Sequence, residues 1–150
     1  MSWSICLLMF AGIPAQPPVV NPDAHFDNYH RALREARLTG KPLLVVLNPG
    51  AESAVGGISM SAIRKTRERR ELLENYVVVV IDASTRHGRI VHRAYERPRL
   101  PHVAVLDKRQ ALQLFTTSET LYGQRWTEIL QTYRNGVRAV ARRPAAYCST

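Results

Sequence analysis

Five β-branched residues stand in succession at Val77–Ile81, and this run constrains the fold more than any other feature of the sequence. Side chains of this kind favour extended backbone. A second apolar run, Leu43–Leu47, is bounded by Pro42 and by Asn48-Pro49-Gly50. Short, uninterrupted apolar runs between turn residues are typical of strands that are buried on both faces. Because the segment between the two runs is long enough for a crossover helix, the sequence predicts a parallel βαβ unit.

Helical and strand patterns flank this unit. We expect helices over 23–38, 59–75, 89–95 and 124–134, and strands over 43–47, 77–81, 102–106 and 111–116. Asp23 is suited to cap the first helix, and Gly40 followed by Lys41-Pro42 is suited to end it. The last two strands form a hairpin, which adds antiparallel strands to the sheet. The order predicts a three-layer α/β/α domain with a central mixed four-stranded sheet, since helices must cover both of its faces.

The 150 residues allow a single domain with a substantial core. Ile5–Ile13 is almost wholly apolar and precedes Pro14-Ala15, which resembles a secretory signal peptide, although no Lys or Arg comes before it. We expect a signal peptide over 1–15, a Pro-rich linker over 16–22, the folded domain over 23–136 and a basic tail over 137–150. The protein is then periplasmic or secreted, with no membrane span in the mature chain. An uncleaved N-terminal segment packed on the domain would leave it cytoplasmic.

Two local patterns resemble the thioredoxin-like domain family. The stretch from Ala32 to Val45 fits "A-x-x-x-A-x-x-x-G-K-P-L-L-V", which in that family leads into the first central strand. Leu100-Pro101, directly before the strand at 102–106, resembles the family's cis-proline segment. The resemblance covers residues 24–135. It implies a thioredoxin-like fold with a cis peptide bond between Leu100 and Pro101. Pro98 has no such reason to be cis, and we expect a trans bond before it.

The redox motif of that family is missing. Thioredoxin-like oxidoreductases place W-C-x-x-C after the first central strand, where a thiolate attacks a disulfide. Here Ser53 matches the tryptophan, Ala54 and Gly57 match the cysteines, and no cysteine occurs between Cys6 and Cys148. A lone serine hydroxyl without a base is not a nucleophile that could replace sulfur. The sequence therefore excludes thiol–disulfide exchange by a CxxC site, and we assign no catalytic residue.

The resemblance implies a redox-inactive domain that binds a protein or an extended peptide, in a chaperone, scaffold or accessory role. Members of the family hold such chains in a groove through backbone hydrogen bonds. The groove would lie between the degenerate loop and the cis-proline segment, with His102 half exposed at its border. Its residues would be Ser53, Ala54, Val55, Gly56, Gly57, Leu100, Pro101 and His102.

Charge supplies a different hypothesis. The chain has 21 Lys+Arg against 12 Asp+Glu, and a basic surface could bind nucleic acid or another acidic ligand. Its residues would be Arg64, Lys65, Arg67, Arg69 and Arg70. Few aromatic residues interleave with the basic segments, which disfavours binding to single-stranded nucleic acid.

Two further alternatives involve cysteine and histidine. A thiol-dependent activity would have to use Cys148, because Cys6 lies in the predicted signal peptide. The pairs His25/His30 and His87/His92 are spaced i, i+5, which does not bring side chains together on a helix. We therefore expect no metal site and no cofactor.

Overall fold

The computed structural model describes residues 25–138. The predicted signal peptide, the linker and Cys148 lie outside the described residues. In chain order the elements are α1 (Tyr29–Thr39), β1 (Leu43–Asn48), α2 (Met60–Ile63), α3 (Arg67–Leu73), β2 (Val77–Asp82), α4 (Arg86–Ala94), β3 (His102–Leu106), β4 (Gln113–Thr117) and α5 (Gly123–Tyr133).

The four strands form one mixed sheet in the order β2-β1-β3-β4. β1 is parallel to β2, with Val45 opposite Val79, and antiparallel to β3, with Val45 opposite Ala104. β4 pairs antiparallel with β3 and forms an outer edge. At the other edge Phe26 makes an isolated parallel bridge to Val79. The predicted mixed four-stranded sheet is confirmed.

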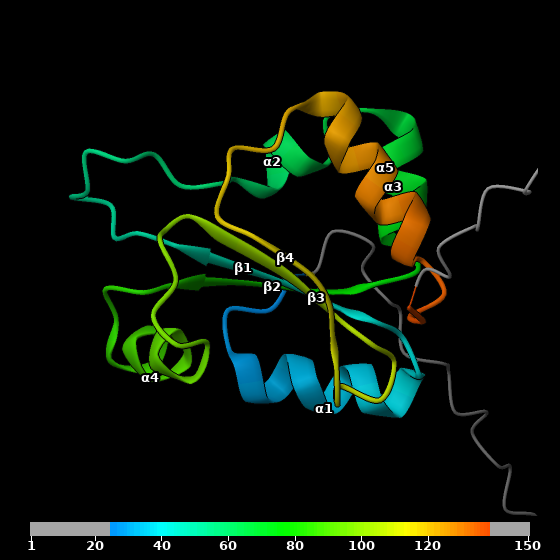
Figure 1. Ribbon diagram of the computed structural model, residues 1–150, viewed down its shortest axis with the longest axis horizontal. Helices are drawn as coiled ribbons and strands as arrows, with labels where there is room; N and C mark the ends of the chain where they lie inside the picture. The colour runs from blue at the N-terminus through cyan, green and yellow to red at the C-terminus, as the bar shows by residue number, and fades with distance from the viewer. Residues whose placement is uncertain (1–24, 139–150) are drawn as a thin grey trace, which may run out of the picture.

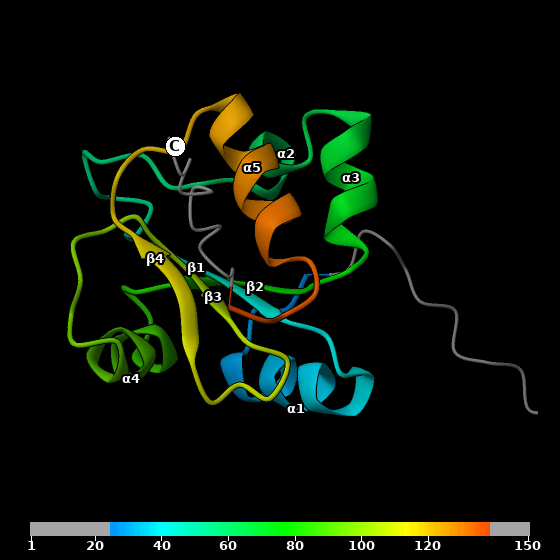
Figure 2. The ribbon, with the colours of Figure 1, turned by 45° about the vertical axis from the view of Figure 1, so that its right-hand side comes forward.

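Helices cover both faces of the sheet, α1 and α4 on one and α2, α3 and α5 on the other (Figure 1 and Figure 2). Successive residues of a strand point to opposite faces, so β1 contributes to two cores. Leu43, Val45 and Leu47 pack with α1 and α4. Leu44 and Val46 pack with the helices of the other layer. β2 likewise contributes Val77, Val79 and Ile81 to the first core and Val78 to the second, which is why both runs are apolar without alternation.

The first helix begins at Tyr29, so the prediction that Asp23 caps it is wrong. Asn28 is the cap, and its side chain accepts a hydrogen bond from the Arg31 N–H. The backbone before it is extended, because Phe26 donates to and accepts from the backbone of β2. The pairing of Phe26 with the sheet therefore delays the helix.

The single helix predicted over 59–75 is two helices, α2 and α3. Thr66 caps the second, accepting from the Arg69 N–H at 3.3 Å. The Arg69 side chain turns inward and donates through Nη1 to the Ala62 carbonyl at the end of the first, at 3.1 Å. The break is thus held by a threonine cap and by one arginine that bonds across it.

Two other boundaries shift for local reasons. α4 begins at Arg86 rather than Arg89, because the Thr85 hydroxyl accepts from the Gly88 N–H. β4 begins at Gln113 rather than Ala111, because a carboxylate oxygen of Asp107 accepts from the N–H groups of Ala111 and Leu112 and keeps them in the turn. No helix in the described part of the chain is both long and apolar enough to cross a membrane.

Candidate functional site

The loop between β1 and α2 is closed at its base by one side chain. The Oδ1 of Asn48 accepts from the Ile58 N–H at 2.8 Å, and its Nδ2 donates to the Ile58 carbonyl at 2.9 Å. An amide side chain can do this because it carries an acceptor and a donor side by side. The two ends of the loop are therefore held together while residues 51–57 are exposed.

Two glycines allow the loop to pass close to its neighbours. A Cβ at Gly50 would lie 2.7 Å from the Cβ of Ser84, and one at Gly57 would lie 3.0 Å from the Cγ of Asn48. A Cβ at Gly56 would meet nothing within 4 Å. Within the loop, Ser53 Oγ accepts from the Val55 N–H at 3.2 Å. Close packing at Gly57 ties the position of the loop to Asn48.

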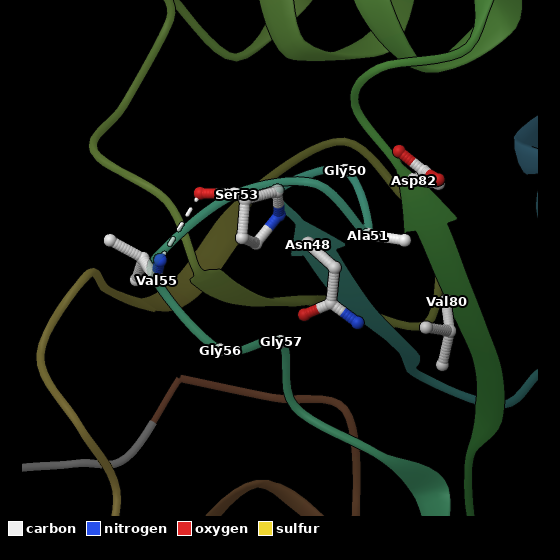
Figure 3. A pocket seen from close by; sticks show the side chains of 10 residues that line it. Asn48, Gly50, Ala51, Ser53, Val55, Gly56, Gly57, Val80 and Asp82 are labelled. Atoms are coloured by element: carbon white, nitrogen blue, oxygen red, sulfur yellow. Dashed lines mark hydrogen bonds between the residues drawn. The ribbon is translucent and has the colours of Figure 1, made fainter.

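A pocket of about 340 Å³ lies between this loop and the carboxyl ends of β1 and β2 (Figure 3). Its lining residues are Asn48, Pro49, Gly50, Ala51, Ser53, Val55, Gly56, Gly57, Val80 and Asp82. The carboxylate of Asp82 accepts from the N–H and Oγ of Ser84, at 2.7 and 2.6 Å, and these bonds lower its pKa. The pocket is therefore lined by a charged carboxylate, by the Asn48 amide, which is already hydrogen-bonded, and by main-chain groups. These groups are suited to bind a ligand.

Sequence reasoning missed Asn48 and Asp82. Both directly follow apolar strand runs, and the carboxyl ends of neighbouring parallel strands meet at one edge of a sheet. The predicted parallel pair could therefore have indicated them. The pairing Asn48↔Asp82 places them side by side at that edge.

The structure brings together only part of the predicted groove. Ser53, Val55, Gly56 and Gly57 line the pocket, whereas Ala54, Leu100, Pro101 and His102 do not. The Leu100–Pro101 peptide bond is cis. The side chain of Leu100 packs against the core beneath α1 and α4. Its N–H and carbonyl form no hydrogen bond with the described residues.

His102 is 6% exposed, so the expectation of a half-exposed side chain is wrong. Nδ1 is bonded to Ser118 Oγ at 2.8 Å and Nε2 to Thr116 Oγ1 at 2.9 Å. Burial and, to a smaller extent, the neighbouring His92 lower the pKa of His102. It is a neutral buried group, satisfied by hydroxyls of β4 and the residue that follows it.

One of the five residues of the predicted basic surface is not at the surface. Lys65, Arg67 and Arg70 are exposed and Arg64 is half buried, but Arg69 is only 2% exposed. Arg69 points inward because its guanidinium bonds within the break between α2 and α3. Among residues 25–138 no group of three His, Cys, Asp or Glu side chains converges as metal ligands would.

Comparison with known proteins defines the class of fold. No family model and no curated protein matches the sequence. A solved thioredoxin from Thermus thermophilus is similar over 73% of this chain and 84% of its own, at 23% identity and a TM-score of 0.55. The oxidoreductase DsbH is similar over 85% of this chain and 96% of its own, at 16% identity and a TM-score of 0.51. The chain has a thioredoxin-like fold.

Proposed function

We propose that this thioredoxin-like domain is redox-inactive and acts by binding an extended segment of another protein. The observation that carries the proposal is the free backbone of Leu100, whose N–H and carbonyl have no partner among the described residues. A free donor and acceptor beside a sheet can pair with an added extended chain. In this proposal the bound chain lies between Leu100 and the loop of residues 50–57.

The loop supports the proposal in two ways. It is held at its base by Asn48, so a bound chain would meet a preformed surface. Its tip presents Val55, which is 51% exposed, beside the pocket. The apolar side chain of Val55 and the adjacent pocket are held by a loop that is fixed at its base. Together they are suited to receive a side chain of the bound chain.

The redox-inactive part rests on composition. The positions matched to the family's cysteines are Ala54 and Gly57, and both cysteines of the chain lie outside the described residues. Without a thiolate in the loop, the protein should not accelerate reduction of a model disulfide above background. A rate that rivals an authentic oxidoreductase and survives Cys148→Ser would contradict this part.

Binding is tested with a fluorescein-labelled, reduced and carboxymethylated protein as the unfolded chain, followed by anisotropy. Gly57→Ala is the test variant, because its Cβ would press on the Asn48 amide, and Gly56→Ala is the matched control with open space. We expect wild type and Gly56→Ala to bind alike and Gly57→Ala to bind about fivefold more weakly. Absence of binding to the wild type, or equal affinity for the two variants, would overturn the proposal.

A further inference from the structure

Arg69 is a buried cation that forms no ion pair with the described residues. Its residue is 2% exposed. Nε donates to Thr66 Oγ1 at 3.2 Å and Nη1 to the Ala62 carbonyl at 3.1 Å, which are both neutral acceptors. Nη2 has no hydrogen-bond partner among the described residues, and it is not fully buried, so solvent reaches it. Arginine cannot shed its charge, so burial of this kind is unfavourable without an anion.

Arg69 faces a pocket. α3 and α5 pack side by side (Figure 2). A hollow of about 470 Å³ lies between the start of α3 and the start of α5. Its lining residues are Lys65, Thr66, Glu68, Arg69, Gly123, Gln124 and Thr127. Its volume is within the usual range for small-molecule sites.

The start of α5 adds donors to the same pocket. Tyr122 occupies the cap position without a side-chain hydrogen bond, and the first turn has no acidic residue. The N–H groups of Gly123 and Gln124 have no acceptor among the described residues. Such N–H groups carry partial positive charge and recurrently bind anions.

We propose that the pocket between α3 and α5 binds the phosphate group of a small phosphorylated molecule. Arg69 and the N–H groups of Gly123 and Gln124 donate to the phosphate oxygens, and Lys65 supplies a second full positive charge. A tetrahedral dianion is the ligand that a guanidinium and a helix start can contact together. The volume beyond the phosphate accommodates the rest of the molecule. Glu68 lines the same pocket and opposes binding.

This site is separate from the peptide groove, and either proposal can fail alone. The probes are inorganic phosphate and glycerol 3-phosphate, followed by calorimetry and by the melting temperature, with sodium chloride at matched ionic strength as the reference. We expect saturable binding of both probes to the wild type. Arg69→Gln should abolish it, and Glu68→Gln should strengthen it about threefold by removing a like charge.

Gly123→Pro separates binding from folding. Proline is tolerated at the first helical position, Tyr122 before it is already extended, and no atom lies within 4 Å of the added Cβ. This variant lacks one proposed donor, so we expect it to fold and to bind phosphate about tenfold more weakly. Arg67→Gln removes one exposed charge outside the pocket and should bind as the wild type does.

Three results would overturn the proposal. One is a response to phosphate that sodium chloride reproduces at the same ionic strength. Another is equal weakening by Arg67→Gln and Gly123→Pro, which would mean diffuse attraction to a basic surface. The third is binding of inorganic phosphate without glycerol 3-phosphate, which would exclude the phosphomonoester class.

Discussion

Aside from the aromatic side chains, Arg69 and His102 are the two polar residues buried in the described part of the molecule, and their environments differ in kind. Each ring nitrogen of His102 meets a hydroxyl, of Thr116 or of Ser118. Arg69 meets two neutral acceptors and keeps an Nη2 group without a partner. The hydrogen-bonding groups of His102 are fully satisfied within the chain, whereas the guanidinium of Arg69 keeps donors without a partner.

The difference follows from chemistry. Imidazole can lose its proton and be buried as a neutral group, and the lowered pKa of His102 agrees with this. A guanidinium stays charged at any ordinary pH. The burial of His102 is therefore consistent with a purely structural role. The burial of Arg69 beside an open pocket indicates a ligand-binding role.

The largest effect on stability that tests this comparison of Arg69 with His102 is expected from replacing Arg69. Arg69→Ala leaves a cavity and frees the Ala62 carbonyl at the break between α2 and α3, so we expect stability to fall by about 3 kcal/mol. The control Arg67→Ala removes a side chain that is 87% exposed and should change stability by less than about 0.5 kcal/mol. Urea denaturation measures both. Equal effects would mean that Arg69 does not bond across the break.

The next largest effect tests the hydrogen bonds of His102. Ser118→Ala leaves Nδ1 of His102 without a partner, and we expect a loss of about 1.5 kcal/mol. Thr120→Ala, at an exposed position nearby in the chain, should be neutral within about 0.5 kcal/mol. Urea denaturation again distinguishes the two. A neutral Ser118→Ala would show that water replaces the hydroxyl.

A smaller effect of opposite sign comes from placing a carboxylate at the start of α5, beside the Arg69 pocket. Tyr122→Asp supplies a side-chain cap to α5, and we expect a gain of about 1 kcal/mol. Tyr122→Ala, which adds no cap, is the control. Thermal unfolding measures the gain. The response to phosphate should shrink in Tyr122→Asp, because the new carboxylate can accept from the Gln124 N–H and places a negative charge beside the Gly123 N–H. An unchanged response would contradict the assignment of those groups.

The smallest effect concerns pH. His102 has a folded pKa below its ordinary value of 6.5, so the unfolded chain takes up a proton first as the pH falls. Stability from this group is therefore present above about pH 6.5 and is lost below it. We expect His102→Asn to lose less stability than the wild type between about pH 7.5 and 5, as followed by melting temperature. A steeper loss in the variant would contradict a neutral His102.

The sequence by itself determined the sheet. The apolar runs at 43–47 and 77–81 predicted two neighbouring parallel strands, because strands that are covered on both faces are apolar at every position. Gly40 in the left-handed conformation ends α1 as its position predicted. The absence of cysteine from the loop after β1 also needed no structure. Each of these depends on residues that are close in sequence.

Only the tertiary structure decided which polar residues are buried. Arg69 stands in a run of charges that predicts an exposed helix face, and its burial depends on the break at Thr66 and on packing against α5. His102 is buried because β4 brings Thr116 and Ser118 to its two nitrogens. Hydrogen bonds and packing between segments that are distant in sequence determine these environments. The periodicity of a single segment therefore does not predict them.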